Sequence, residues 1–335
     1  MTLGVVVIGR NEGERLLRCL ASVAPRERAV VYVDSGSSDG SVERARASGA
    51  EVVELDASLP FTAARGRNAG FEALAAEYPG LTCVMFVDGD CEVVAGWFEA
   101  GLNFLAAHPD VGVVFGRRRE RHPEASVWNR CADIEWEGVP GEADTCGGDA
   151  LMRADVVRRA GGYDPTLIAG EDPEFCLRIR RSGARIVRLD REMTLHDAAL
   201  LRFGQWWKRQ ARAGHAFAET VWRHRGDPDP HRRRRLFSVL LYGGALPLVA
   251  LLGLWPTRGA SLLLLAAWVV PWRGVYRDTR LRRPPGDSAL YATLCVAGKL
   301  AEFRGALTFA WNHWVRRRAT ALIEYKGPGI EKGAP

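Results

Sequence analysis

Apolar runs and amphipathic stretches alternate along about the first 90 residues of the chain. Residues 3–9 (LGVVVIG) form a continuous, mostly β-branched run, which is typical of a strand buried on both faces of a parallel sheet. Residues 29–41 give a second strand that ends in an acidic, Ser- and Gly-rich turn, and further strands are predicted at 51–55 and 82–88. Because helical patterns separate these strands, we expect an open α/β sheet that binds its ligands at the carboxyl ends of the strands.

Beyond residue 93 the alternation is less regular. Strand patterns recur at 111–116 and 184–189, and the strand-like segment 191–195 leads to a histidine. The predicted helices cover about residues 16–23, 41–48, 65–76, 172–183 and 203–217. The polar residues that end the first strands, and are therefore expected to converge on one crevice, are Arg10, Asn11, Asp34, Asp88 and Asp90.

From residue 236 the pattern is that of a membrane-associated region. Residues 236–255 carry no charge over 20 positions, enough to cross a bilayer core of roughly 30 Å, and residues 259–272 add 14 more. Arginines flank this pair on both outer sides and only Arg258 lies between, so the positive-inside rule favours a hairpin with both ends in the cytoplasm. A re-entrant hairpin and a soluble helical core are the alternatives. Residues 289–315 predict an amphipathic helix on the bilayer, with a third span as the alternative.

The predicted organisation therefore has four regions. A catalytic domain covers residues 1–219 and a basic linker covers 220–235. The membrane hairpin and amphipathic helix cover 236–318, and a tail covers 319–335. The expected fold class is α/β, an open and mostly parallel sheet flanked by helices, followed by a helical membrane-associated C-terminal region.

Composition and charge narrow the function. The chain is 47% hydrophobic and 26% charged, as in a folded protein, and its seven cysteines show no CxxC spacing, which speaks against a zinc site or a disulfide framework. Residues 201–335 carry a net charge of +15, whereas the preceding residues carry −9. Since the basic half also holds the long apolar runs, we expect membrane lipids rather than nucleic acid as its partner. The N-terminus is too short in apolar residues for a secretory signal, which places the catalytic domain on the cytoplasmic face of the cell membrane.

The segment FVDGDCEV places Asp88 and Asp90 one residue apart, directly after an apolar run. Gly89 permits a tight turn, so both carboxylates can face one centre. Hard divalent cations such as Mg²⁺ or Mn²⁺ take carboxylate oxygens together with substrate phosphates, which predicts a metal and phosphate site here. The alternative is a solvated surface turn.

With these residues in view, the chain resembles family 2 glycosyltransferases, which have the A-type nucleotide-sugar-binding fold. The resemblance covers about residues 3–215 and includes five motifs in order. They are VVVIGRNEGERLLRCLASV, VYVDSGSSDGSVERA, FTAARGRNAGFEAL, VMFVDGDCEV and the segment from CGGDALMRADVV to GEDPEF. No one of them is specific alone, and their order is what identifies the family.

The resemblance implies roles for particular residues. Asp90, with Asp88 nearby, would hold the metal, and His196 is offered as a third ligand. The predicted nucleotide-binding residues are Arg10, Glu12, Asp34, Arg65, Asn68 and Asp88. The alternative role of Glu12 is that of a helix first-turn acid favoured by the helix dipole, and the alternative role of Asp34 is that of an Asx-turn residue.

Asp172 is the predicted catalytic base, with Glu171 as its less certain neighbour. Displacement at the anomeric carbon needs a carboxylate that accepts the proton of the acceptor hydroxyl. Pro173 suits an early helical position, so the alternative role of Asp172 is that of a helix N-cap.

Two further pairs are predicted to meet the sugars. Gly147 and Gly148 let the backbone approach the donor sugar, unless they belong to a plain loop. Trp206 or Trp207 can stack on a sugar or lipid, unless their helix is simply interfacial. The Q-x-x-R-W sequence of processive synthases is replaced here by QWWKRQ at residues 205–210, which favours transfer of one sugar.

These features predict an inverting, metal-dependent glycosyltransferase. It would move a sugar from a nucleoside-diphosphate donor to a lipid-linked or saccharide acceptor near the membrane, in cell-envelope polysaccharide or glycolipid synthesis. The alternatives are a Mg-dependent nucleotidyltransferase and a non-catalytic membrane scaffold that keeps the fold. A dehydrogenase is disfavoured because no G-x-G-x-x-G follows the first strand.

Overall fold

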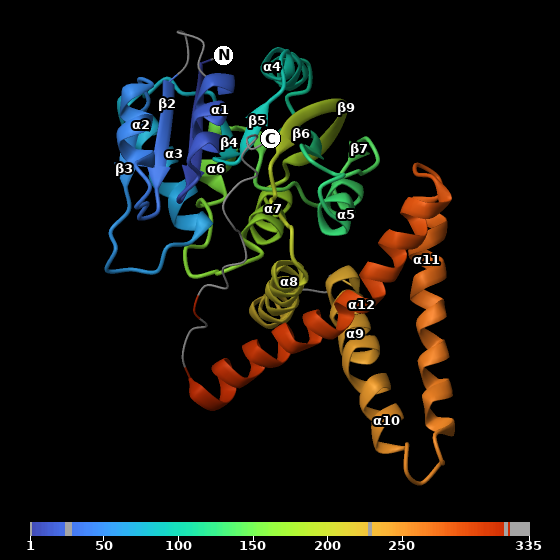
Figure 1. Cartoon of the computed structure of the whole chain (residues 1–335). Coiled ribbons are helices and arrows are strands. Elements are labelled where there is room, and N and C mark those ends of the chain that lie inside the picture. Colours follow the sequence, from blue (N-terminus) through green and yellow to red (C-terminus); the bar gives the residue numbers. More distant parts are fainter. Residues whose placement is uncertain (1, 24–28, 227–229, 318–320, 322–335) are drawn as a thin grey trace, which may run out of the picture. The chain divides into compact units, whose positions relative to one another are not determined.

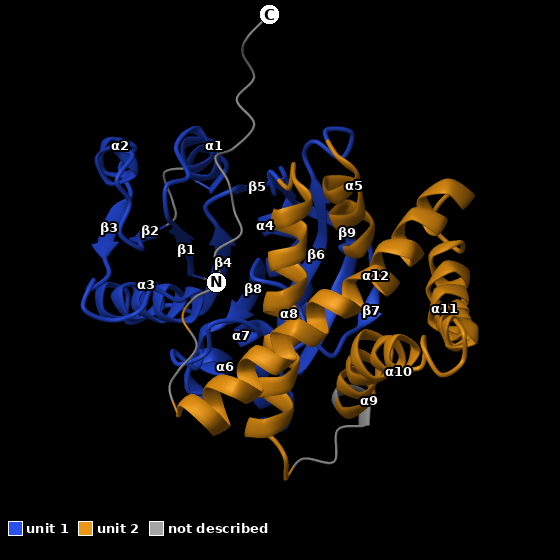
Figure 2. Ribbon diagram, turned by 60° about the horizontal axis from the view of Figure 1, so that its bottom comes forward, with its two compact units in different colours: residues 1–125, 136–199, 326–335 blue, residues 126–135, 200–325 orange. Residues whose placement is uncertain are grey.

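The computed structural model describes residues 2–23, 29–226, 230–317 and 321, so the predicted tail lies outside the described residues except for Ala321. The chain forms two compact units (Figure 2). The first comprises the residues up to Ala125 together with Trp136–Ala199. The second comprises Ser126–Glu135 and the described residues from Leu200 onward.

One mixed sheet forms the centre of the first unit (Figure 1). Its strands are β1 Leu3–Gly9, β2 Ala29–Asp34, β3 Glu51–Glu54, β4 Cys83–Asp88, β5 Cys91–Val93, β6 Val111–Glu120, β7 Gly141–Glu142, β8 Ala150–Arg153 and β9 Arg185–His196. Their order is β3-β2-β1-β4-β8-β6-β9-β5, and β7 pairs with β9. The first four are parallel and β6 is parallel to β9, whereas the other pairings are antiparallel. The predicted α/β fold is therefore confirmed, with its parallel part at the N-terminal side.

The register of β1 explains why the first polar residues meet. Along β1, Ile8 pairs with Asp88 of β4 and Gly9 pairs with Asp34 of β2. Both acidic strand ends therefore flank the carboxyl end of β1, as the alternating pattern predicts. The apolar run of β1 is buried on both faces, because helices cover the sheet on either side.

The helices of the first unit follow the strands closely. They are α1 Glu14–Val23, α2 Ser41–Ala47, α3 Ala63–Glu77, α4 Trp97–Ala107, α6 Ala154–Arg159 and α7 Glu171–Arg181. Helix α3 lies very close to the sheet, since a side chain at Gly70 would overlap Val6. The approach brings the buried face of α3 against β1, which matters for the site below.

The second unit is helical. Its elements are α5 Val127–Glu135, α8 Phe203–Arg223, α9 Pro230–Leu240, a π-turn Leu241–Ala245, α10 Leu246–Leu252, a 3₁₀ helix Ala260–Trp268, α11 Val269–Thr279, α12 Pro285–Ala310 and a π-turn Trp311–Arg316. Helices α8 and α12 cross at glycines: a Cβ at Gly214 would overlap the Glu302 carbonyl, and one at Gly305 the Ala211 carbonyl. Backbones approach this closely only where side chains are minimal.

This crossing explains two differences from the predicted organisation. Helix α8 extends past residue 219 to Arg223 and packs on α12, so it lies with the second unit rather than with the first. The second difference concerns α12, which corresponds to the helix predicted to lie on the bilayer. Its buried face packs against α8. Among the described residues, one helix, Arg233–Leu252, is long and apolar enough to cross a membrane, and α12 does not meet that criterion.

Candidate active site

The turn between β4 and β5 carries the two carboxylates predicted to bind metal. The backbone amide of Gly89 donates to the carbonyl of Ile8 at 2.8 Å, which ties the turn to the end of β1. A Cβ at Gly89 would lie 3.1 Å from that carbonyl oxygen, so the position favours glycine. The turn leaves Asp90 buried, with 3% of its surface exposed, and Asp88 partly exposed.

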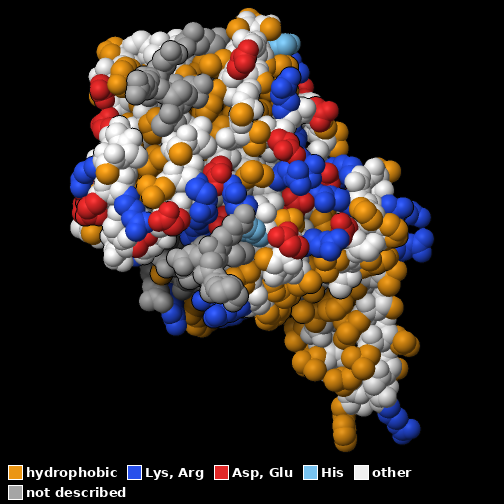
Figure 3. Space-filling model, turned by 45° about the horizontal axis from the view of Figure 1, so that its top comes forward, with side chains coloured by type: hydrophobic (Ala, Val, Ile, Leu, Met, Phe, Trp, Pro, Cys, Tyr) orange, Lys and Arg blue, Asp and Glu red, His pale blue; other side chains and the backbone are white. Residues whose placement is uncertain are grey.

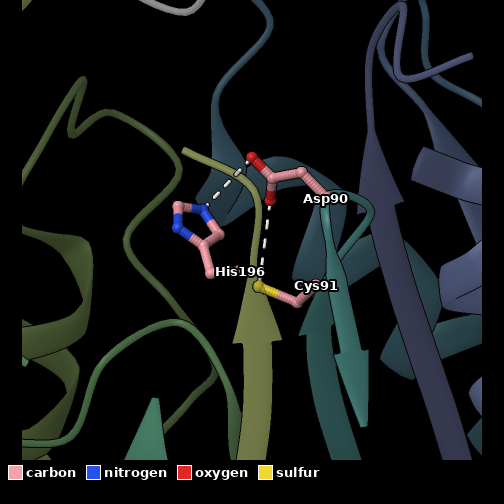
Figure 4. A group of neighbouring side chains, drawn as sticks. All are labelled: Asp90, Cys91 and His196. Atoms are coloured by element: carbon pink, nitrogen blue, oxygen red, sulfur yellow. Dashed lines mark hydrogen bonds and ion pairs between the residues drawn. The ribbon is translucent and has the colours of Figure 1, made fainter. Parts of the chain in front are cut away.

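The strand pairing brings His196 to this turn. Cys91 of β5 lies opposite His196 of β9, and the Asp197 amide donates to the Asp90 carbonyl at 3.0 Å. As Figure 4 shows, the imidazole then faces the Asp90 carboxylate, with Nε2 3.2 Å from Oδ2. The other ring nitrogen lies 4.0 Å from the Glu120 carboxylate. Two residues predicted as ligands from distant parts of the sequence thus lie at one point.

The donor set fits a hard divalent cation. A carboxylate and a neutral imidazole are ligands for Mn²⁺, and Mg²⁺ also takes carboxylates together with phosphate oxygens. Glu120 lies behind this histidine, on the side where a carboxylate commonly supports a metal-bound imidazole, although at 4.0 Å the two are not hydrogen-bonded. The ligand atoms of Asp90, Cys91 and His196 all lie within 4.8 Å of one another, so the sulfur of Cys91 is a further candidate ligand, although burial raises the pKa of its thiol well above the usual value.

Buried acids accumulate around this point. Burial raises the pKa of Glu120 to about 8, and the negative charges of Asp197 and Asp90 contribute to the rise against the hydrogen bonds that Glu120 accepts from His122 and Ala198. Asp197 is 1% exposed, and the guanidinium of Arg18 lies 3.6 Å from its carboxylate. Burial therefore favours the neutral form of Glu120, whereas Asp197 lies close to a positive charge.

A buried arginine joins the two acidic motifs. From α3, Arg67 donates through Nη2 to Asp88 at 3.0 Å, and through Nη1 to Glu171 at 3.2 Å and Asp172 at 3.1 Å. Its guanidinium also lies over the ring of Tyr163, 5.3 Å from the centroid. Sequence reasoning missed this residue. A signal did exist, because Arg67 occupies the helical stripe otherwise formed by Ala64, Phe71 and Leu74, where an arginine needs buried partners.

A second arginine supports the same carboxylates. Arg118 of β6 lies 2.8 Å from Asp149 and 3.4 Å from the second oxygen of Asp88. Asp149 in turn accepts the Asp88 amide at 3.0 Å and the Thr194 hydroxyl at 2.8 Å. Arg118 stands in no pattern that the sequence marks, and Asp149 lies in the CGGDALMRADVV segment but has no predicted role. Their contact depends on the antiparallel placement of β8 beside β4 and β6.

The predicted base lies at the start of α7. The helix is capped by Gly170 in the left-handed conformation, with φ 78°, so the alternative that Asp172 is the N-cap is wrong. Its carboxylate instead meets Arg67. Burial raises the pKa of Asp172 to about 7, with Arg67 opposing the rise and Glu171 and Asp88 adding to it. A carboxylate that titrates near neutral pH is suited to proton transfer.

The glycine pair also lies at this network. A Cβ at Gly148 would overlap Nη2 of Arg67 and lie 3.1 Å from both oxygens of Asp88. Glycine is therefore required for the backbone to pass the ion pair. A Cβ at Gly147 would lie 4.0 Å from Arg118, an ordinary distance. Contact of either residue with a donor sugar stays a prediction.

The predicted nucleotide residues near β1 and β2 have other partners. Asp34 accepts four hydrogen bonds: from the Tyr32 and Ser37 hydroxyls at 2.8 and 2.5 Å, and from the Gly36 and Ser37 amides at 2.8 and 2.7 Å. This is the Asx-turn geometry of the alternative interpretation. Glu12 is buried 2.8 Å from Arg15, whereas Arg10 is exposed over the ring of Phe61.

Two predicted residues of α3 hold neighbouring loops. Arg65 donates to the carbonyls of Leu59 at 2.9 Å and Pro60 at 2.7 Å. Asn68 both accepts from and donates to the backbone of Tyr163, at 2.8 Å each. Their nucleotide-binding role stays a prediction, and Arg67 between them is the residue of this helix that reaches the carboxylates.

The two tryptophans belong to the second unit. Trp206 is buried and stacks on Trp128, with ring centroids 4.8 Å apart. Trp207 is half-buried, 5.7 Å from the ring of Phe203. Because Trp206 is already packed in this aromatic cluster, Trp207 is the better candidate of the pair for contact with a sugar or lipid.

Comparison with known proteins gives a consistent result. Residues 4–157 match the family model for glycosyl transferase family 2. The chain is 28% identical over 284 residues to the pre-mycofactocin glycosyltransferase of Mycobacterium tuberculosis, which covers 79% of this chain and 55% of that protein. It is 26% identical over 255 residues to the glycosyltransferase AglE of Haloferax volcanii, covering 72% of this chain and 79% of the relative. The chain thus spans about half the length of the mycobacterial relatives it matches.

Among solved structures, the chain is similar to the mannosyltransferase PcManGT of Pyrobaculum calidifontis, which was solved with GDP-Man and Mn²⁺. The TM-score is 0.57 at 16% identity, over 92% of this chain and 87% of the other. At that identity the likeness concerns the fold alone. Residues 4–157 thus carry a domain that matches glycosyl transferase family 2, and the mixed α/β sheet is that of the A-type glycosyltransferase fold.

Proposed function

We propose that the chain is a metal-dependent, inverting glycosyltransferase that moves one sugar from a nucleoside-diphosphate donor to a lipid-linked or membrane-near acceptor. It would act at the cytoplasmic face of the cell membrane, in cell-envelope polysaccharide or glycolipid synthesis. The observation that carries the proposal is the Asp90–His196 pair beside a network in which Arg67 joins Asp88 to Asp172.

In this mechanism Asp90 and His196 would hold Mn²⁺ or Mg²⁺, with Asp88 nearby. When bound, the cation would supply Lewis-acid stabilisation of the charge that grows on the leaving diphosphate. Asp172 accepts the proton of the acceptor hydroxyl as that oxygen attacks the anomeric carbon. One displacement of this kind inverts the configuration there. The altered sequence at residues 205–210 favours release after a single transfer.

Arg67 has a positioning role in this scheme. Its two ends hold a donor-side carboxylate, Asp88, and the base, Asp172, at fixed positions on α3, β4 and α7. A base fixed in this way needs no reorganisation before it accepts a proton.

The donor is proposed as a nucleoside-diphosphate sugar, and GDP-linked sugars are the first to test because PcManGT was solved with GDP-Man and Mn²⁺. Calorimetry with GDP, UDP, CDP and dTDP, each with and without Mn²⁺, would identify the nucleotide. Asp90→Asn should weaken the metal-dependent binding by at least about 10- to 100-fold, since that is the cost of losing an outer-shell partner and Asp90 is proposed as a direct ligand. Asp110→Asn, an exposed control, should leave it unchanged. Equal metal-dependent affinity in both variants would falsify the site.

A further inference from the structure

The second unit contains an apolar hairpin made of α10, the turn 253–259 and the 3₁₀ helix Ala260–Trp268. Trp255 at the turn is 93% exposed and Leu263 is 78% exposed. Figure 3 shows hydrophobic side chains gathered on this protruding part of the molecule. Other exposed apolar residues of the hairpin are Leu248, Val249, Leu251, Leu252, Leu262 and Leu264. Helix Arg233–Leu252 is only 22% buried in its most apolar window, whereas a core helix is mostly buried.

The turn satisfies its own polar groups. The Thr257 hydroxyl donates to the Gly253 carbonyl at 2.6 Å and accepts from the Ser261 amide at 2.9 Å. The Ser261 hydroxyl donates to the Ala250 carbonyl at 2.7 Å, and the Gly259 amide to the Leu254 carbonyl at 2.8 Å. Backbone and hydroxyl groups must be paired internally in this manner if a turn is to leave water, because hydrocarbon offers no replacement partner.

Helix α12 limits how far the hairpin protrudes. It crosses the helical segment that leads into the hairpin at Gly243, where a side chain would overlap the Lys299 carbonyl. This part of α12 is charged, with Lys299 2.8 Å from Glu302 and an exposed Arg304. The Trp268 indole donates to the Tyr242 carbonyl at 3.0 Å, so the returning 3₁₀ helix reaches the crossing at the same level. From the crossing at Gly243 to the turn, the first helical segment of the hairpin has about twelve residues with a rise of ~1.5 Å each. The returning 3₁₀ helix has nine residues with a rise of ~2.0 Å each, so both extend ~18 Å beyond α12.

Charge sets the same limit from both ends. A bilayer core is about 30 Å thick, so ~18 Å of apolar hairpin is too short to cross it. The turn carries Arg258, and a guanidinium is costly at the bilayer centre. With the charged crossing at the level of the headgroups, a layer about 5–7 Å thick, a hairpin of ~18 Å keeps Arg258 short of the midplane of the core. Above the crossing, α9 and α11 carry an arginine collar of exposed residues, Arg233, Arg234, Arg273, Arg277 and Arg280. Such a collar is suited to anionic headgroups.

We propose that the hairpin of residues 246–268 inserts into a single leaflet of an anionic phospholipid bilayer without crossing it, while the arginine collar binds the headgroups. The apolar surface, the internally paired turn and the basic collar all point to lipid rather than to a second copy of the chain. The proposal is independent of donor and acceptor chemistry, so vesicle binding can succeed or fail whatever a transfer assay shows.

Flotation of the full chain with vesicles tests the insertion. The protein should float with phosphatidylglycerol-containing vesicles in high salt, and Leu252→Asp/Leu263→Asp should lower the bound fraction by at least about tenfold. Val139→Asp, at an equally exposed apolar position of the first unit, is the matched control and should bind as before. Loss of binding in the control, or retention in the double variant, would overturn the proposal. A chain that does not float but forms a dimer broken by the double variant would assign the hairpin to self-association.

Labelling tests the depth. A Pro256→Cys variant, which keeps Arg258 and labels an exposed position of the same turn, is reconstituted with a membrane-impermeant maleimide either outside the vesicles or enclosed within them. We expect protection from both reagents and rapid labelling after detergent is added. The unsubstituted chain, whose cysteines are buried or half-buried, gives the background. Labelling by the enclosed reagent would show a hairpin that crosses, and labelling from outside would show one that does not insert.

Discussion

Two acidic strand ends flank β1, and they differ in what their carboxylates contact. At the end of β2, Asp34 accepts four hydrogen bonds within its own turn, two of them from backbone amides. At the end of β4, Asp88 and Asp90 face side chains from elsewhere in the fold: Arg67, Arg118 and His196. In the sequence both segments are acidic turns that follow an apolar strand. In the structure Asp34 stabilises its own turn, whereas Asp88 and Asp90 contact charged or ionisable side chains from other elements.

The difference concerns what each carboxylate can exchange. An ionised carboxyl group has about four acceptor sites, and Asp34 has filled its sites with neighbours that fix the turn. Asp88 and Asp90 are held by cationic or titratable side chains, whose interaction with a carboxylate changes when a metal or a diphosphate arrives. The β4 end is therefore the one at which we expect binding and chemistry to be lost on substitution.

The largest effect on activity is expected at Asp172, which Arg67 joins to the carboxylate of Asp88. Asp172→Asn removes the proton acceptor and should lower kcat by about 10²- to 10⁴-fold while nucleotide binding persists. Single-turnover transfer with the donor found by calorimetry would measure the loss of rate. Calorimetry on the same variant would measure nucleotide binding. Asp155→Asn on the exposed face of α6 is the control. Wild-type turnover in Asp172→Asn would assign the base to another residue, with Glu171 the nearest candidate.

Arg67 gives the next effect, because three carboxylates lose their shared partner when it is removed. Arg67→Gln should lower the free energy of unfolding by about 3–5 kcal/mol, the usual cost of breaking a buried ion pair. Arg65→Gln, two residues away and bonded to loop carbonyls, should cost less than about 1 kcal/mol. Urea unfolding of the two variants makes the comparison. Similar midpoints would mean that the buried network contributes nothing to folding.

Arg67 also shows where sequence reasoning succeeds and where it stops. The strands β1 to β4 were predictable because their apolar runs are continuous, and the D-x-D turn because it follows one of them. The partners of that turn were not, since Arg67, Arg118 and Asp149 meet only through the packing of α3 and the antiparallel insertion of β8. His196 was predictable from the family resemblance, although no spacing in the sequence links it to Asp90.

The boundary between the two units was also hidden from the sequence. Helix α8 follows the catalytic motifs directly, and its amphipathic pattern does not say which partner it packs on. Gly214 and Gly305, which lie about 90 residues apart, decide the matter by allowing α8 and α12 to cross at backbone distance. Single glycines in helices are weak sequence signals, because their meaning depends on the facing helix.

Asp34 tests the comparison directly. If its role is to fix the turn, Asp34→Ala should cost about 1–3 kcal/mol of stability, because the Gly36 and Ser37 amides lose their acceptor. Asp34→Asn keeps one side-chain oxygen and should cost less. Metal-dependent nucleotide binding should persist in the Asp34→Asn variant at temperatures where that variant is folded. Loss of nucleotide binding in Asp34→Asn at unchanged stability would favour the nucleotide role implied by the family resemblance.

The smallest expected effect is on pH dependence. Because burial raises the pKa of Asp172 to about 7, the base is increasingly protonated below neutral pH, and kcat/KM should fall by about tenfold per pH unit well below that value. The sign follows from the need for an ionised acceptor: activity is gained as pH rises through 7 and lost as it falls. A carboxylate with an ordinary pKa near 4 would leave the profile flat between pH 6 and 8. Nucleotide binding measured over the same range separates this inflection from titration at the metal ligands, since only transfer depends on Asp172.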